Sequence, residues 1–213
     1  MAKYIISKNN PSSRAMVKYP STKSDPICKW RNASVETVIE LVKALPKKSM
    51  TKEAFRDYMT KKWQGDFFHT AYQLAVQLGL YYEDDIEYIP RFDHDIIKEE
   101  AMEYMRKWIK RYYVPNPFTK RGFIGIYPAI NLLNGLADYL ENHPTKPNLA
   151  TAGAALFGGE MGNIGCVKYI LNEYSDVIHV DGSNDMKLLQ NSYGSVDVNN
   201  ARDDKKAFFE HFK

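Results

Sequence analysis

The order of segments between residues 34 and 91 is the feature that most constrains the fold. Apolar residues recur there at helical spacing in three successive stretches, which end near Pro46, Gly65 and Gly79. Two short β-prone runs follow, one on each side of an acidic turn. Three helices followed by a β-hairpin is the order of a winged helix, whose third helix usually enters the DNA major groove. The sequence therefore predicts a winged-helix unit over residues 35–98.

The order helix, helix, helix and strand recurs between residues 123 and 182, without sequence identity to the first stretch. We therefore predict a repeated architecture and not a sequence repeat. The expected fold class is mainly α with small β wings, in which tandem winged-helix (helix-turn-helix) units are joined by a long helix. The expected domains are a basic N-terminal arm (1–34), a first winged-helix unit (35–98), a linker helix and loop (99–122), a second winged-helix-like unit (123–182) and a tail (183–213) that leads to a missing C-terminal region.

Charge is distributed unevenly along the chain, although the formal net charge is +3. Residues 1–62 contain 14 basic and 5 acidic side chains, whereas residues 83–103 contain nine acids and two bases. Unpaired positive charge at one end of a chain suggests a polyanionic partner such as double-stranded DNA. The alternative is a surface of mixed lysine and glutamate that binds no partner. Because an acidic wing would repel phosphate, we expect the wing of the first unit to face away from DNA.

Three groups of side chains are candidates for DNA contacts. Those of the N-terminal arm would follow the phosphate backbone, and they are Lys3, Lys8, Asn10, Ser12, Ser13, Arg14, Lys18 and Arg31. Those on the exposed face of the third helix, where glutamines match adenine edges, are His69, Thr70, Gln73 and Gln77. Those of the linker loop and the second unit are Lys120, Arg121, Asn163 and Lys168. The alternatives are an arm packed over the next domain, a winged helix that contacts protein, and a solvated helix end.

A complete catalytic site is not evident in the sequence. The five histidines are scattered, with no pair at metal-ligand spacing. The run Asp185-Met186-Lys187 has the acid-x-Lys pattern of Mg²⁺-dependent nucleases, and Asp176 or Asp181 would be the upstream acid. However, it follows a turn cluster, and the pattern occurs often by chance. We therefore interpret it as an exposed turn, keep Asp185 and Lys187 as weak catalytic candidates, and expect neither a metal site nor a cofactor in this chain.

The apolar runs of the chain are shorter than the roughly 20 residues that cross a membrane, and the first residues lack the apolar core of a signal peptide. The two cysteines, Cys28 and Cys166, are too few for a disulfide framework. We therefore expect no membrane partner and a cytoplasmic location.

A further set of stretches spans about residues 3–172. They are Lys3-Tyr4-Ile5-Ile6-Ser7, the Asn-Pro-Ser-Ser-Arg stretch at 10–14, Leu78-Gly79-Leu80-Tyr81-Tyr82-Glu83-Asp84 leading into Tyr88-Ile89, Met105-Arg106-Lys107-Trp108 with the Pro-rich loop, and Ile126-Tyr127-Pro128-Ala129-Ile130-Asn131-Leu132-Leu133. In order and spacing these stretches resemble the N-terminal DNA-recognition region of type IIS restriction and nicking endonucleases, the AlwI-like group and more distantly FokI. In that family, winged-helix-like units recognise DNA, and a separate C-terminal PD-(D/E)xK domain cuts at a fixed distance.

No such nuclease domain is evident in this sequence. The resemblance therefore implies a recognition fragment of a type II restriction endonuclease, which is a hydrolase, or a subunit whose nuclease lies on another chain. Mg²⁺ is expected only for that missing nuclease domain, and the resemblance assigns no catalytic residue here. Two other functions stay open: a stand-alone tandem winged-helix regulator or replication initiator, and a small Mg²⁺ nuclease that uses Asp185 and Lys187.

Overall fold

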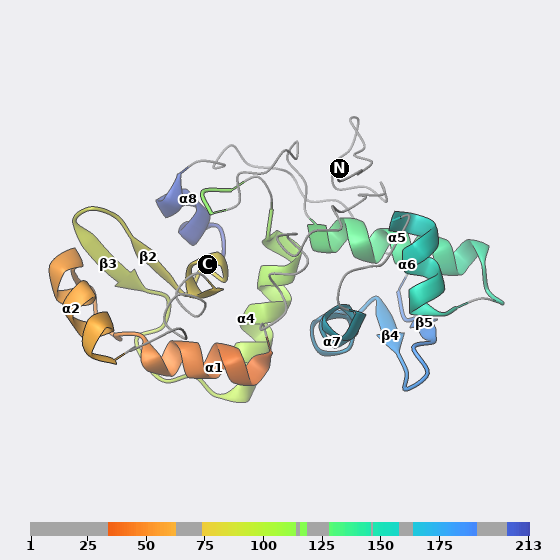
Figure 1. Ribbon diagram of the computed structural model, residues 1–213, viewed down its shortest axis with the longest axis horizontal. Helices are drawn as coiled ribbons and strands as arrows, with labels where there is room; N and C mark the ends of the chain where they lie inside the picture. The colour runs from red at the N-terminus through yellow and green to blue at the C-terminus, as the bar shows by residue number, and fades with distance from the viewer. Residues whose placement is uncertain are drawn as a thin grey trace. The chain divides into compact units, whose positions relative to one another are not determined.

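The computed structural model describes residues 34–62, 74–113, 116–118, 128–145, 147–157, 164–190 and 204–213 (Figure 1). Its fold is mainly helical with small antiparallel sheets, as the sequence predicted. The described residues fall into two compact units. The first unit contains residues 34–62, 74–108, 116–118 and 204–213, and the second unit contains residues 109–113, 128–145, 147–157 and 164–190.

The elements of the first unit come from both ends of the described chain. They are α1 (Val35–Ala44), β1 (Met50–Thr51), α2 (Lys52–Lys62), β2 (Tyr81–Glu83), β3 (Glu87–Pro90), most of α4 (Lys98–Arg111) and α8 (Lys205–Glu210). Of the third predicted helix, the described part is residues 74–77, which are helical. Gly79 follows with a φ of +67°, a conformation that glycine adopts readily and that ends a helix.

Helices α1 and α2 form where the sequence predicted them. Ser34 caps α1, because its hydroxyl accepts a hydrogen bond from the Thr37 N–H at 3.1 Å. The apolar positions 35, 38, 41 and 42 of α1 are buried, as the helical spacing indicated. In α2, Phe55 and Met59 lie one turn apart and are both buried.

The sheet of the first unit is antiparallel, with the strand order β1-β3-β2. The β2–β3 hairpin was predicted, and it pairs Tyr82 with Ile89. Strand β1 was not predicted, because a pair of residues between two helices has no periodicity to read. It pairs Met50 with Tyr88, so that the segment between α1 and α2 joins the sheet.

An aromatic cluster forms the centre of this unit. The ring of Phe55 stacks on that of Tyr88 with centroids 4.1 Å apart, and Tyr81 lies 5.4 Å from both rings. These three side chains come from α2, β3 and β2, and each is buried. Fully burying one such ring contributes about 1.5–3 kcal/mol, so the cluster holds helix and hairpin together.

Helix α4 follows the hairpin and contacts the end of the third predicted helix. The Trp108 indole N–H donates a hydrogen bond to the Gln77 carbonyl at 3.1 Å, and the Tyr104 hydroxyl donates one to the Leu78 carbonyl at 2.6 Å. These bonds satisfy carbonyls that a helix end leaves without intrahelical partners. Acids stand in the first turn of α4 and bases in its last turn, in agreement with the helix dipole.

Helix α8 belongs to the first unit, although sequence analysis assigned residues 183–213 to a tail. Its residues Phe208, Phe209 and the following Phe212 are buried. Phe212 approaches the backbone so closely that a Cβ built on Gly79 would lie 2.8 Å from its Cδ2 atom. The apolar pattern of this segment was visible in the sequence, but its partner surface, built from residues far away in the chain, was not.

The second unit contains the end of α4 together with a compact set of helices and one hairpin. These are α5 (Pro128–Asn142), α6 (Leu149–Phe157), α7 (Ile164–Tyr174), β4 (Ile178–Val180) and β5 (Met186–Leu188). The three helices and β4 were predicted. Strand β5 was not, because the turn-rich run from residue 181 to 185 suggested that regular structure ended there. It pairs antiparallel with β4, and Val180 and Met186 face the core.

The two units share one pattern of backbone pairing. In the first unit β1 pairs Thr51 with Glu87, and in the second an isolated bridge pairs Asn148 with Asp185. Three backbone hydrogen bonds of the first unit also have counterparts in the second unit. The bond from Lys52 N–H to Ile86 C=O (2.9 Å) corresponds to that from Leu149 N–H to Asn184 C=O (2.8 Å), and the bond from Asp84 N–H to Glu87 C=O (3.1 Å) corresponds to that from Asp181 N–H to Asp185 C=O (2.9 Å). The bond from Arg91 N–H to Leu80 C=O (2.9 Å) corresponds to that from Leu189 N–H to Val177 C=O (2.7 Å). The repeat predicted from element order thus extends to strand register.

Candidate nucleic-acid interface

Most side chains predicted to contact DNA lie outside the described residues. These are Lys3, Lys8, Asn10, Ser12, Ser13, Arg14, Lys18, Arg31, His69, Thr70, Gln73, Lys120, Arg121 and Asn163. The structure describes Gln77 and Lys168, and also the weak catalytic candidates Asp185 and Lys187. The structure therefore locates a small part of the predicted interface.

Gln77 is not on an exposed face. The residue is 9% exposed, and the Trp108 indole of α4 donates a hydrogen bond to its backbone carbonyl. The expectation that Gln77 is exposed was wrong, because a helix that arrives later in the chain packs against the same turn. The DNA contacts proposed below do not include this residue.

Lys168 is held by the hairpin of its own unit. Its ammonium donates hydrogen bonds to the Asp181 carbonyl and, at 3.3 Å, to the Asn184 side-chain oxygen. One turn later, Asn172 exchanges two hydrogen bonds of 2.8 Å with the backbone of Val180. Both side chains therefore fasten α7 to the β4–β5 hairpin.

Asp185 and Lys187 lie in a hairpin and not in an irregular turn. The Asp185 carboxylate accepts a hydrogen bond from the Asn148 side chain at 3.2 Å, and Lys187 pairs with His179 across the strands. The Asp181 carboxylate accepts the Asp185 N–H at 2.9 Å, which closes the turn. In the described part of the chain, no three His, Cys, Asp or Glu side chains gather in a way that could hold a metal ion.

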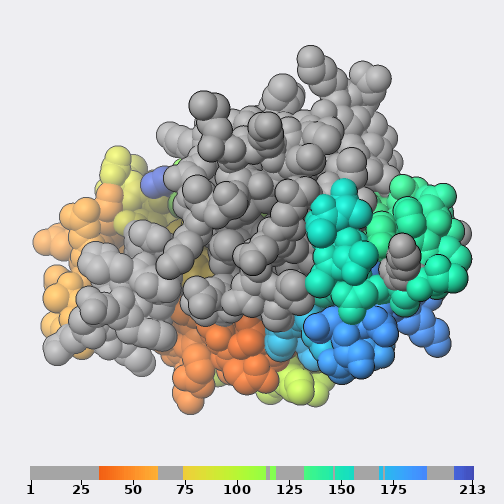
Figure 2. Space-filling view, turned by 45° about the vertical axis from the view of Figure 1, so that its right-hand side comes forward, coloured from red at the N-terminus to blue at the C-terminus, as the bar shows by residue number. Residues whose placement is uncertain are grey.

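Helix α2 carries basic side chains that the sequence analysis did not select. Arg56 and Thr60 are exposed and one helical turn apart, and Lys61 is exposed beside them. Among the described residues, no carboxylate pairs with Lys48, Arg56 or Lys61. The space-filling view shows α2, coloured light orange, at the surface of the first unit (Figure 2). The available sequence signal was that helical spacing places these residues outside the apolar stripe of Phe55 and Met59.

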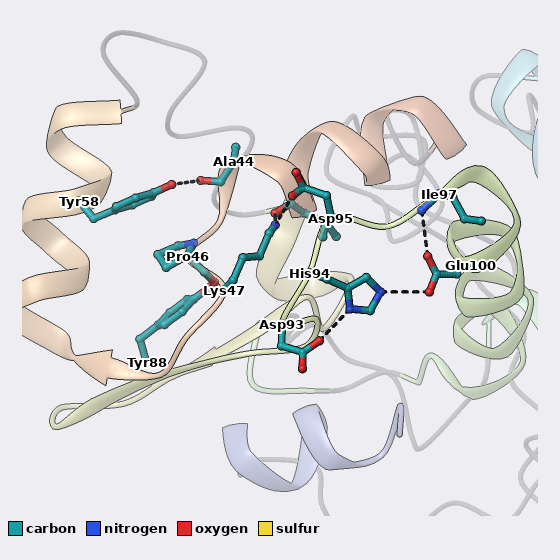
Figure 3. A network of polar contacts seen from close by, with 11 residues as sticks. Ala44, Pro46, Lys47, Tyr58, Tyr88, Asp93, His94, Asp95, Ile97 and Glu100 are labelled. Atoms are coloured by element: carbon teal, nitrogen blue, oxygen red, sulfur yellow. Dashed lines mark hydrogen bonds and ion pairs between the residues drawn. The ribbon is translucent and has the colours of Figure 1, made fainter.

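Hydrogen bonds hold the segment that links α1 to α2 against α2 and β3 (Figure 3). The Tyr58 hydroxyl donates to the Ala44 carbonyl at 3.1 Å, and the Tyr88 hydroxyl donates to the Pro46 carbonyl at 2.8 Å. Lys47 donates to a carbonyl in the last turn of α1 and forms an ion pair with Asp95 at 2.9 Å. These contacts join α1, α2, β3 and the segment before α4, so that exposed bases on α2 stand on a fixed frame.

A histidine bridges two carboxylates at the start of α4 (Figure 3). The His94 Nδ1 atom lies 2.7 Å from an Asp93 oxygen, and its Nε2 atom lies 3.1 Å from a Glu100 oxygen. The hydrogen bond with Asp93, followed by that with Glu100, raises the pKa of His94 above its ordinary value of 6.5. The other Glu100 oxygen accepts the Ile97 N–H at 3.0 Å, so the same carboxylate caps the helix.

The turn between β2 and β3 is built around one carboxylate. Asp84 accepts hydrogen bonds from the Tyr82 hydroxyl at 2.7 Å, the Ile86 N–H at 2.7 Å and the Glu87 N–H at 2.8 Å. These bonds, with that of Tyr82 the strongest, lower the pKa of Asp84 to about 2. Asp181 has the corresponding place in the second unit, where it accepts the Ser183 N–H at 2.8 Å.

No protein-family model, curated protein or solved structure matches this chain. Among the helices that the structure describes, none is long and apolar enough to span a bilayer.

Proposed function

We propose that this chain recognises double-stranded DNA through two winged-helix units. The observation that carries the proposal is the topology of the first unit, in which β1 lies between two helices and pairs with the far strand of a terminal hairpin, giving the order β1-β3-β2. That arrangement is expected of a winged helix. The matching register of the second unit supports the same assignment there.

Charge supports DNA as the partner. Arg56 and Lys61 are exposed bases of α2, and they belong to residues 1–62, which contain 14 basic and 5 acidic side chains. Basic side chains such as these, which have no carboxylate partner among the described residues, are suited to phosphate oxygens. In this proposal α2 and the N-terminal arm contact the backbone, and the third helix reads bases through Gln73.

We further propose that the chain is the recognition part of a type II, IIS-like restriction endonuclease. The resemblance in residues 3–172 supports this more specific assignment. The Mg²⁺-dependent nuclease domain would then lie outside this chain, on a further region or another subunit. Cleavage would require that domain, whereas binding would require only the chain described here.

Selection of binding sites from a random duplex pool tests the DNA-binding proposal. We expect one enriched motif, and an affinity that falls steeply with salt because each neutralised phosphate releases counterions. The variant Arg56→Gln should lower the slope of log K against log salt by about 0.9 and leave the selected motif unchanged. Lys43→Gln, which removes the same charge from α1, is the control and should change neither. A pool without any enriched motif would contradict sequence recognition.

A stand-alone regulator or replication initiator is the second candidate. An independent binding protein needs a complete core of its own. Helix α8 favours this candidate, because its phenylalanines complete the core of the first unit within this chain. Incubating a plasmid that carries the selected motif with this chain and Mg²⁺, with and without cell extract, distinguishes the candidates. Cleavage that appears only with a second protein favours the restriction system. Cleavage by the chain alone that is lost in Asp185→Ala favours the small nuclease.

A further inference from the structure

The wing of the first unit contains four carboxylates, those of Glu83, Asp84, Asp85 and Glu87. Uncompensated, they would repel the phosphates of a duplex, and this was the reason to expect that the wing faces away from DNA. The structure gives Asp84, Asp85 and Glu87 partners from the hairpin itself, from α2 and from α8. The following inference rests on the proposed DNA-binding function and concerns what these partners do.

The negative charge of Asp84 is stabilised within the wing itself, because its carboxylate accepts hydrogen bonds from the Tyr82 hydroxyl and from the backbone of the turn. Asp85 is paired with Lys52, the first residue of α2, with an N–O distance of 2.6 Å. Glu87 is paired with Lys206 of α8 at 3.8 Å. The wing acids are thus partly neutralised by one lysine from the start of α2 and by another from the C-terminal helix.

Helix α8 places two adjacent lysines along the wing. The ammonium of Lys206 lies 5.8 Å from the ring centroid of Tyr82, on strand β2. Lys205 and Lys206 are exposed, so their charges also face solvent. After its main stabilisation by Lys52, the ionised form of Asp85 is further favoured by Lys205, which lowers its pKa.

The position of these lysines is fixed by the buried side of α8. The guanidinium of Arg91 lies 3.8 Å from the ring centroid of Phe209 and donates a hydrogen bond to the Phe209 carbonyl. Through Nε, Arg91 also donates to the Gly79 carbonyl at 3.0 Å. The Phe209 ring lies 6.1 Å from that of Tyr82. A half-buried arginine therefore anchors α8 beside strand β2.

We propose that α8 is part of the DNA-facing surface of the first unit, where Lys205 and Lys206 shield the wing carboxylates and allow the wing to approach phosphate. In this arrangement the lysines act on Asp85 and Glu87 and do not themselves bind DNA. The expectation of a wing turned away from DNA is replaced by a wing whose charge depends on the C-terminal helix.

A double-mutant cycle tests this role with a fluorescein-labelled, mixed-sequence duplex at low salt. The variant Lys205→Gln/Lys206→Gln should weaken binding about 3- to 10-fold, the range expected for two exposed charges. In the background Asp85→Asn/Glu87→Gln the same change should alter the affinity less than about twofold, because no carboxylate is left to shield. Thermal unfolding checks that α8 stays docked, and Lys43→Gln shows how much the loss of one exposed positive charge elsewhere on the unit changes the affinity.

Each outcome has one meaning. A loss that persists in full after the acids are neutralised would show that the lysines contact DNA directly, which overturns the shielding role. Unchanged affinity in the lysine variant would show that the wing does not face DNA, although the wild-type chain still binds. If the wild-type chain shows no salt-dependent duplex binding, both this inference and the proposed function are wrong.

Discussion

Replacing Gly79 with alanine perturbs the contact between the hairpin and the C-terminal helix. At a φ of +67°, a residue with a Cβ atom costs about 1–2 kcal/mol relative to glycine. The new Cβ would also lie 2.8 Å from Phe212 Cδ2 and 3.1 Å from the Tyr104 hydroxyl. Phe212 is 1% exposed, and the Tyr104 hydroxyl is bonded to the Leu78 carbonyl, so neither group can move away without loss. Losing a buried phenylalanine altogether costs about 3–5 kcal/mol, and displacing its ring costs part of that. Together with the backbone cost, we expect Gly79→Ala to lower the free energy of unfolding by about 2–4 kcal/mol.

Urea unfolding, followed by tryptophan fluorescence and circular dichroism, measures this cost. The double variant Gly79→Ala/Phe212→Ala isolates the steric part, because the backbone cost remains when the ring is absent. We expect a coupling of about 1–2 kcal/mol between the two changes. Gly182→Ala is the matched control, since nothing lies within 4 Å of a Cβ there and its φ is ordinary. Additive effects, or a cost for Gly79→Ala below about 1 kcal/mol, would refute this account of how α8 is docked.

Three further predictions concern single side chains of the first unit. The pKa of His94, measured by NMR titration, should lie above 6.5. Because the pKa is raised in the folded state, the contribution of His94 to the stability of the fold is complete below pH 6.5 and is lost as pH rises through the folded pKa. Asp84→Asn should reduce the stability that the protein gains in urea titrations as pH rises from about 2 to about 4, because a carboxyl with a depressed folded pKa contributes fully only above its unfolded pKa. Tyr88→Phe should destabilise the unit by about 1–3 kcal/mol in chemical denaturation, since it leaves the Pro46 carbonyl without its buried donor.

Local sequence patterns predicted the elements whose signals are contained in the elements themselves. The buried stripe of α1, from Val35 to Val42, and the β-prone runs on each side of Asp84 are examples. Each depends on a periodicity of a few residues, which the fold then satisfies by burying one face. The repeated order of elements was visible for the same reason.

Features made by distant residues were not predictable in this way. Strand β1 consists of Met50 and Thr51, and its pairing is determined by β3, far along the chain. Gln77 has the polarity of an exposed residue, yet Trp108 covers its turn. Composition and spacing do not reveal which later segment will pack on an earlier one.

The candidate site shows the same division. Arg56 and Lys61 lay within reach of sequence reasoning, because helical spacing alone places them outside the apolar stripe of Phe55 and Met59. Lys168 was selected for its charge, but its ammonium is bonded to the neighbouring hairpin, and a helical pattern says nothing about that bond. Lys206 was not selected at all, because its relation to Glu87 exists only after α8 has docked.

The docking of α8 also has a consequence for synthesis. The first unit contains the earliest described helix, α1, but its core lacks three phenylalanine rings until residues 204–213 have been made. During translation, the surface around Gly79 and Trp108 therefore stays open while the entire second unit emerges from the ribosome. Such an interval exposes apolar surface to chaperones and to neighbouring nascent chains. The second unit can complete its own hairpin first, so the chain is expected to mature from its middle outward, with the docking of α8 as the closing step.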